Sequence, residues 1–196
     1  MLAADFFARL GLFVYRGFLD RDWCARTRAE MQKAPTVSAT VIHEKGMVVD
    51  ETVRRAGLIG VSAATTSAVR ERLLAVRLQL ENHFQVELRD CVPPQFLLYR
   101  EGDFYVAHRD NGLAKERQIS IVVFVNGIDP HRQESNRYDG GTLTFYGLID
   151  DDHRRTAIGL PLLPEEGLLI AFRSHLVHEV SPVTHGVRYT VVSWFL

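Results

Sequence analysis

The spacing of apolar residues predicts helices in the first half of the chain. Residues 66–84 carry the clearest helical pattern, in which apolar side chains share one stripe and charged residues lie between them. The stripe consists of Val69, Leu73, Val76, Leu80 and Phe84. Shorter helices are predicted over residues 3–10, which Gly11 would end, and over residues 21–33, which Asp20 would cap.

The pattern changes to short β-type runs after Pro93-Pro94. Eight runs follow, separated by turns rich in Gly, Asn and Glu: QFLLYR, FYVAHRD, QISIVVFVN, GGTLTFYG, AIGLPLL, GLLIAFRS, HEVSPV and RYTVVSWFL. Short strands at this regular spacing imply a sandwich or jelly roll. We therefore predict a mainly β fold with supporting helices. It forms a single domain over residues 1–196, in which helices and a β extension (1–92) brace a double-stranded β-helix, or jelly-roll, core (93–196).

Two polar segments are predicted as loops beside this core. Residues 43–55, HEKGMVVDETVRR, are charged and poorly periodic, and residues 127–139, GIDPHRQESNRYD, form the longest apparent connection. If they flank an open groove, the substrate is expected to be a peptide. A closed pocket would favour a metabolite.

Composition narrows the classes of function. The net charge is −1, from 23 Lys and Arg against 24 Asp and Glu, so no electrostatic footprint for nucleic acid is present. Cys24 and Cys91 form neither a disulfide framework nor a zinc motif, which suits a reducing compartment. No stretch has the roughly 18 apolar residues of a membrane helix, and the N-terminus lacks the features of a signal peptide. The expectation is a cytoplasmic protein without nucleic-acid or membrane partners.

The stretch YVAHRDNG (105–112) carries the candidate chemistry. A kinase-type catalytic loop would need Asn five residues after the Asp, where Lys115 stands, so that interpretation is excluded. On a strand, His108 and Asp110 point to the same face and can bind one metal ion together, while Arg109 points away. A facial triad of two histidines and one carboxylate also needs a distal histidine. If a 2-oxo acid binds there, an arginine is expected for its far carboxylate.

The C-terminal segment SHLVHEVSPVTHGVRYTVVSWFL supplies both groups. His178 lies on a β-type run, and Arg188 follows ten residues later. His175 is the nearest competitor as the second metal ligand. An arginine at the start of an apolar strand needs an anionic partner if it points inward.

Taken together, these motifs resemble the iron(II)/2-oxoglutarate dioxygenases of the prolyl 4-hydroxylase superfamily, especially the oxygen-sensing (hypoxia-inducible-factor-type) prolyl hydroxylases and their bacterial relatives. The resemblance rests on YREGDFYVAHRD, on DGGTLTFY with Gly140-Gly141, and on HEVSPVTHGVRYTVVSWF. It implies Fe(II) held by the catalytic residues His108, Asp110 and His178. It also implies 2-oxoglutarate and dioxygen as co-substrates, with ascorbate as an accessory.

The resemblance also assigns residues around the metal. Arg188 would pair with the far carboxylate of 2-oxoglutarate, and Tyr99 would lie at the co-substrate pocket. The oxygen-sensing enzymes carry a hydrogen-bonding Tyr where Phe124 stands, and Phe cannot donate that bond. Tyr105, Trp194 and Phe124 are candidates for the substrate pocket. Residues 43–55 correspond to a region that covers the substrate in the family.

The implied reaction is hydroxylation of a C–H bond with release of succinate and CO2. A prolyl residue of a peptide or protein is the first candidate substrate, and a free amino acid or other small metabolite is the second. A metal-binding jelly roll without turnover is the alternative from another class. The charge of −1 disfavours a nucleic-acid demethylase, and Asp110 argues against a halogenase, which lacks this carboxylate.

Overall fold

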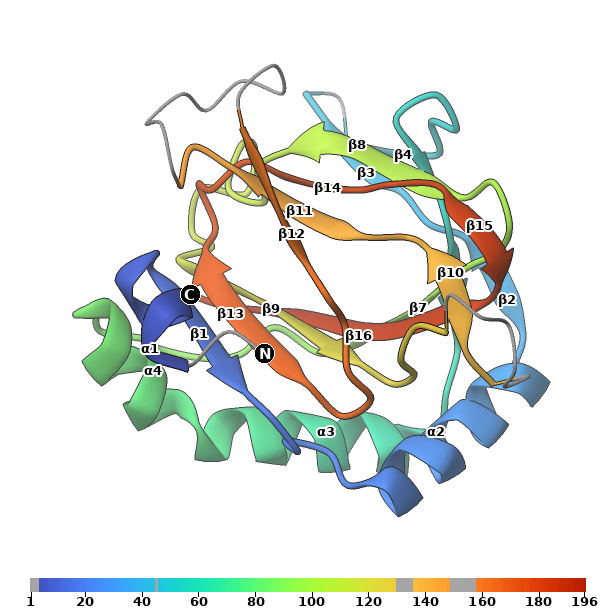
Figure 1. Ribbon diagram of the computed structural model, residues 1–196, viewed down its shortest axis with the longest axis horizontal. Coiled ribbons are helices and arrows are strands. Elements are labelled where there is room, and N and C mark those ends of the chain that lie inside the picture. The colour runs from blue at the N-terminus through green and yellow to red at the C-terminus, as the bar shows by residue number, and fades with distance from the viewer. Residues whose placement is uncertain (1–3, 45, 130–135, 149–157) are drawn as a thin grey trace.

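Two antiparallel sheets face each other, and helices cover the outer side of the larger one (Figure 1). The computed structural model describes residues 4–44, 46–129, 136–148 and 158–196. The larger sheet has seven strands in the order β1 (Leu12–Tyr15), β13 (Leu169–Arg173), β9 (Ile119–Phe124), β16 (Arg188–Phe195), β7 (Gln95–Tyr99), β6 (Gly57–Ile59) and β2 (Thr36–Ser38). The smaller has five, in the order β12 (Gly159–Leu162), β11 (Leu143–Tyr146), β14 (His178–Val180), β8 (Phe104–His108) and β5 (Arg54–Arg55).

Two two-stranded sheets complete the described β structure. β10 (Tyr138–Gly140) pairs with β15 (Val183–Gly186), and β3 (Val41–His43) pairs with β4 (Gly46–Val48). The mainly β prediction is confirmed, and each of the eight predicted runs contains a strand. β3 and β4 correct the prediction for residues 43–55, because part of that segment is a hairpin and not a loop. Of the predicted loop 127–139, residues 130–135 lie outside the described part of the chain.

The N-terminal helices begin where capping chemistry places them. Helix α2 (Arg21–Lys33) matches its predicted range, and the Asp20 side chain accepts a hydrogen bond from the Trp23 N–H at 2.7 Å. Helix α1 (Ala4–Arg9) ends before Gly11, whose positive φ of 71° suits glycine.

The long helix predicted over residues 66–84 is in fact two helices. α3 (Ala63–Ala75) and α4 (Arg77–Phe84) meet at Val76, where the backbone leaves helical geometry (φ −95°, ψ 1°). The Val76 N–H shares its hydrogen bond between the carbonyls of Leu73 and Leu74, so the last turn tightens and the axis can change direction. All five residues of the predicted stripe are nevertheless buried. None of the described helices is long and apolar enough to cross a membrane.

Strand β9 explains why one run of the sequence is almost wholly apolar. Ile121 and Val123 pack in the cluster beneath the helices, whereas Val122 and Phe124 pack in the cluster between the two sheets. Because successive side chains of a strand point to opposite faces, both faces of β9 are covered. The cluster between the sheets encloses the region where the candidate metal ligands lie.

Candidate metal centre

Antiparallel pairing of β8 with β14 brings the two predicted histidines together. His108 ends β8, His178 begins β14, and the two residues are direct partners in the register. Their ring centroids lie 4.2 Å apart. Asp110 follows two residues after His108, so a local motif and one long-range strand pair assemble the whole triad.

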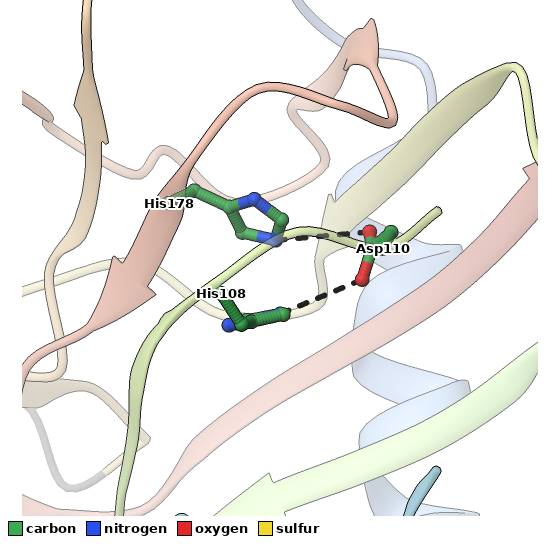
Figure 2. A group of neighbouring side chains, drawn as sticks. All are labelled: His108, Asp110 and His178. Atoms are coloured by element: carbon green, nitrogen blue, oxygen red, sulfur yellow. Dashed lines mark ion pairs between the residues drawn. The ribbon is translucent and has the colours of Figure 1, made fainter. Parts of the chain in front are cut away.

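The three side chains point toward one another (Figure 2). Asp110 Oδ1 lies 3.4 Å from His108 Nε2, and Asp110 Oδ2 lies 3.7 Å from His178 Nε2. The ligand atoms of all three residues lie within 4.8 Å of one another. Exposed His175, the competitor for the second histidine, does not belong to this cluster.

Main-chain carbonyls fix the orientation of both imidazole rings. His108 Nδ1 lies 2.8 Å from the carbonyl oxygen of Val106, and His178 Nδ1 lies 2.9 Å from that of Leu176. Because a carbonyl oxygen only accepts, each Nδ1 is the protonated nitrogen. Both Nε2 atoms therefore present a lone pair to the centre of the triad, as metal-binding histidines do.

The protonation states of the triad suit a divalent cation. Burial raises the pKa of Asp110, but His178 and His108, when they are protonated, favour the carboxylate more strongly and hold this pKa below its usual range. Burial, together with the like charge of His108, lowers the pKa of His178 to about 4, against the pull of Asp110. The result is a carboxylate beside a neutral imidazole. Two nitrogens and one carboxylate on one side of an ion form the facial triad typical of non-haem Fe(II), and the residues present fit that metal.

Arg188 is buried at the start of β16 and lacks part of its hydrogen bonding. Its guanidinium lies 5.0 Å from the ring centroid of Tyr99 and 5.2 Å from that of Phe124. Nη1 donates to Thr190 Oγ1 at 3.4 Å, whereas Nε is buried without a partner. An unsatisfied buried guanidinium is costly unless an anion completes it, so this corner fits a carboxylate.

Gly141 leaves the room that Arg188 needs. Its φ is +56°, and an added Cβ would lie 3.0 Å from Arg188 Cδ and 2.8 Å from Val183 Cγ2. The Gly140-Gly141 pair is therefore more than a turn, because its second glycine lets the backbone pass close to the arginine.

Tyr138 is a polar residue of this corner that sequence reasoning missed. It is 1% exposed, and its hydroxyl has no hydrogen-bond partner. Tyr138 pairs across β10–β15 with Gly186, two residues before Arg188. Burial raises the pKa of Tyr138 to about 12, and the positive charge of Arg188 opposes that rise. The only signal in the sequence was a Tyr two residues before the glycine pair, and its position depends on long-range pairing.

A cavity of about 380 Å³ connects the triad to Arg188. Tyr99, Tyr105 and Trp194, three of the predicted pocket residues, line it. Tyr105 also stacks on His108, with centroids 3.5 Å apart and planes at 16°. Phe124 is fully buried beneath Arg188 and is not among the residues that line the cavity.

The mouth of the cavity lies between the β3–β4 hairpin and residues 112–117. Ile42, His43 and Met47 of the hairpin line one side. The other predicted flank was residues 127–139, but none of the described residues of that segment lines the cavity. Arg109, predicted to point away from the metal, is exposed and contributes to the lining of the cavity.

The fold and the site define a class: a jelly-roll protein with a triad of two histidines and one carboxylate, and a buried cationic corner for a second ligand. The family model described as the 2OG-Fe(II) oxygenase superfamily matches residues 94–196. The chain belongs to this superfamily, and the predicted resemblance is confirmed.

Known proteins agree with this assignment. A PKHD-type hydroxylase of Synechococcus sp. (strain JA-2-3B'a(2-13)) is 30% identical over 132 residues, which cover 63% of this chain and 52% of that protein. The chain thus spans about half the length of the curated relatives it matches. A prolyl-4-hydroxylase of Pseudomonas putida superposes with a TM-score of 0.74 at 24% identity, over 98% of this chain and 95% of that one. A prolyl hydroxylase of Trichoplax adhaerens, in complex with a hypoxia inducible factor peptide fragment, gives a TM-score of 0.70 at 17% identity, over 98% and 86%. At these identities the solved structures show the shared fold.

Proposed function

We propose that the protein is an Fe(II)- and 2-oxoglutarate-dependent dioxygenase that hydroxylates a prolyl residue of a peptide or protein, with release of succinate and CO2. One observation carries the proposal. A complete triad and a buried, partly unpaired Arg188 line the same cavity. A protein that only bound a metal ion would not need a second site, at Arg188, for an anion.

His108, Asp110 and His178 would hold the iron. When bound, Fe(II) supplies the activation of dioxygen and the oxidative decarboxylation of 2-oxoglutarate that hydroxylation requires. The three residues would supply two nitrogen ligands and one carboxylate, and a site of this kind leaves positions open for co-substrates. The carbonyls of Val106 and Leu176 keep both imidazoles in the tautomer that binds metal.

Arg188 and Tyr138 would hold the far carboxylate of 2-oxoglutarate. Arg188 Nε and the Tyr138 hydroxyl are two buried donors without partners in one corner, and a carboxylate can accept from both. Tyr138 would supply the hydroxyl that the family has at the place of Phe124. The rings of Tyr99 and Phe124 pack against the guanidinium and keep water away from it.

The hairpin and the aromatic wall would position the substrate. Tyr105 and Trp194 offer flat apolar surfaces near the triad, which suit a pyrrolidine ring. Met47 and Leu113 are exposed apolar side chains that line the cavity, and a peptide entering it would cover them. The peptide-bound structure from Trichoplax adhaerens supports a peptide substrate by analogy.

We also expect the enzyme to work in a reducing, cytoplasmic compartment. Cys24 and Cys91 are both free and buried. Burial raises the pKa of Cys24 to about 12, so its thiol stays protonated and inert. We assign neither cysteine a chemical role.

Release of succinate from 2-oxoglutarate tests the proposal directly. Protein reconstituted with Fe(II) is expected to form succinate under air, and prolyl peptides are expected to raise the rate. Asp110→Ala should abolish the reaction, whereas Asp22→Ala, the same change at an exposed position of α2 outside the cavity, should retain it. A protein that binds Fe(II) but forms no succinate with any prolyl peptide or free amino acid would be a binding module.

A further inference from the structure

The wall of the catalytic cavity carries more positive than negative charge. Four arginines line the cavity, and Asp110 is the single carboxylate residue among the described lining residues. The arginines are Arg54, Arg109, Arg117 and Arg188. The charges of bound Fe(II) and of the dianion 2-oxoglutarate would cancel one another. The remaining excess of positive charge would therefore face the substrate.

Arg54 is the arginine whose surroundings call for a further ligand. It is 9% exposed and lines the cavity, and its Nε is buried without a hydrogen-bond partner. Nη1 donates to the carbonyl oxygen of Thr40 at 3.1 Å, and the guanidinium lies 4.8 Å from the centroid of the Tyr105 ring. In the described parts of the chain, no carboxylate forms an ion pair with Arg54.

A purely structural role leaves this arrangement incomplete. A buried guanidinium is normally stabilised by an anion and by hydrogen bonds to most of its donors. The Thr40 carbonyl and the Tyr105 ring satisfy only some of the hydrogen-bond donors and part of the charge of the Arg54 guanidinium. Its charge and its free Nε therefore remain available to whatever fills the cavity.

Arg54 also lies close to the chemistry. β5 pairs with β8, so Arg54 stands opposite Tyr105, and the Tyr105 ring stacks on the metal ligand His108. Arg117, with its guanidinium 3.8 Å from the Trp194 ring centroid, adds a second positive charge on the wall that carries the other aromatic residue. A substrate held at Arg54 would thus place neighbouring atoms near the triad.

We propose that the substrate carries a carboxylate and that Arg54 binds it, with the charge of Arg117 contributing. This inference rests on the proposed function, because it names the substrate class of the same cavity. The carboxylate has three possible sources: a free amino acid, the C-terminus of a peptide, or an acidic side chain beside the target residue. All three offer the same planar acceptor to the Arg54 fork.

Matched pairs of acid and amide probes separate these sources. The pairs are L-proline with L-prolinamide, acetyl-Gly-Pro with its C-terminal amide, and acetyl-Pro-Asp-amide with acetyl-Pro-Asn-amide. Binding is measured calorimetrically on protein loaded with Mn(II) and 2-oxoglutarate, so that no turnover is needed. The acid of at least one pair should bind about tenfold more tightly than its amide, as expected for a charge-assisted hydrogen bond. The pair with the largest difference identifies the source.

Arg55 provides the matched control for Arg54. It is the next residue of β5, carries the same charge, and is exposed with its guanidinium 5.4 Å from the Phe104 ring centroid. Arg54→Gln should abolish the preference for the acid, Arg54→Lys should keep part of it, and Arg55→Gln should leave it unchanged. Thermal unfolding and binding of 2-oxoglutarate verify that each variant is folded with an intact co-substrate site.

The outcomes distinguish this inference from the proposed function. If every acid binds no better than its amide, if no acid binds, or if Arg54→Gln keeps the preference, the carboxylate site is wrong. Succinate formation is measured in parallel. A carboxylate preference without any succinate would leave the Arg54 site standing and contradict the dioxygenase, and succinate without a preference would do the reverse.

Discussion

At the scale of single residues, the main chain prepares the site for metal and co-substrate. The carbonyls of Val106 and Leu176 orient the two imidazoles, so the Nε2 lone pairs converge without help from another side chain. At the other end, Arg188 and Tyr138 each keep one buried polar atom unpaired. A buried polar atom without a partner destabilises the free protein. Because an anion that accepts a hydrogen bond from it removes this cost, such atoms favour binding of a specific anion.

Tyr138 and Phe124 give a prediction at this scale. Tyr138→Phe should weaken binding of 2-oxoglutarate about tenfold, because one hydrogen bond to a carboxylate is lost while the ring packing is kept. Adding Phe124→Tyr should restore part of the affinity, since the hydroxyl returns from the opposite wall. Both are measured by anaerobic titration of the Fe(II)-loaded protein with 2-oxoglutarate, followed by absorption. Unchanged affinity in Tyr138→Phe would exclude the hydroxyl from the co-substrate site.

The spacing of four candidate site residues was visible in the sequence. His108 and Asp110 are two residues apart, and Arg188 follows His178 by ten residues. In the structure Asp110 lies in the turn after β8, and His178 and Arg188 belong to different sheets. Tyr138 and Arg54 carry no such signal. Their positions depend on the β10–β15 and β5–β8 pairings, which join segments about 45 and 50 residues apart in sequence, and no local pattern specifies them.

At the scale of secondary-structure elements, the β3–β4 hairpin is the part that differs most from expectation. Its sequence is charged and irregular, so it was predicted as a loop, yet Val41 to His43 pair in register with Gly46 to Val48. Cross-strand pairing between short segments outweighed weak local propensity. Ile42 and Met47 of the hairpin line the cavity, which is why we propose that the hairpin contacts the substrate.

The hairpin yields a prediction about substrate binding. Met47 is 66% exposed in the free protein, so Met47→Ser should leave stability unchanged. If a peptide covers this side chain, the KM for a prolyl peptide should rise about tenfold while kcat is retained. Val37→Ser, at a 62% exposed position of β2 outside the catalytic cavity, is the control and should not alter KM. Equal KM values for both variants would mean that the hairpin does not contact the substrate.

The division of the predicted long helix shows another limit of pattern reading. The apolar stripe of residues 66–84 correctly identified the buried face, because burial depends on the period of the sequence. The break at Val76 could not be predicted in this way, because no Gly or Pro marks it in the sequence.

At the scale of the whole molecule, the site lies where two sheets enclose a cavity. His108 and His178 lie in the five-stranded sheet, and Arg188 lies in the seven-stranded sheet. A metal ion at the triad and 2-oxoglutarate at Arg188 would therefore connect the two sheets. The jelly roll and its strand runs were predictable, because strand period and turn chemistry are local. The segments that line the cavity could not be predicted in the same way: Gly112, Leu113 and Arg117 line it, and none of the described residues of 127–139 does.

Because metal and 2-oxoglutarate would bind between the two sheets, we predict that both ligands stabilise the folded protein against thermal unfolding. Mn(II) and 2-oxoglutarate, each at about 100 times its dissociation constant, should each stabilise the fold by roughly 3 kcal/mol and should each raise the Tm by about 6–12 °C. Calorimetry with and without a chelator measures the shift. Asp110→Ala should lose the metal-dependent part, and Arg188→Gln the part due to 2-oxoglutarate. A full shift in both variants would place the ligands elsewhere.

The central claim is that the triad and Arg188 form one oxygen-activating site, and labelled dioxygen tests it most directly. Fe(II)-loaded protein is incubated with 2-oxoglutarate under ¹⁸O₂, and succinate is analysed by mass spectrometry. The account predicts succinate that carries one labelled oxygen atom in the native protein, and none formed by Asp110→Ala. Iron-loaded native protein that yields no succinate, or succinate without label, would contradict it.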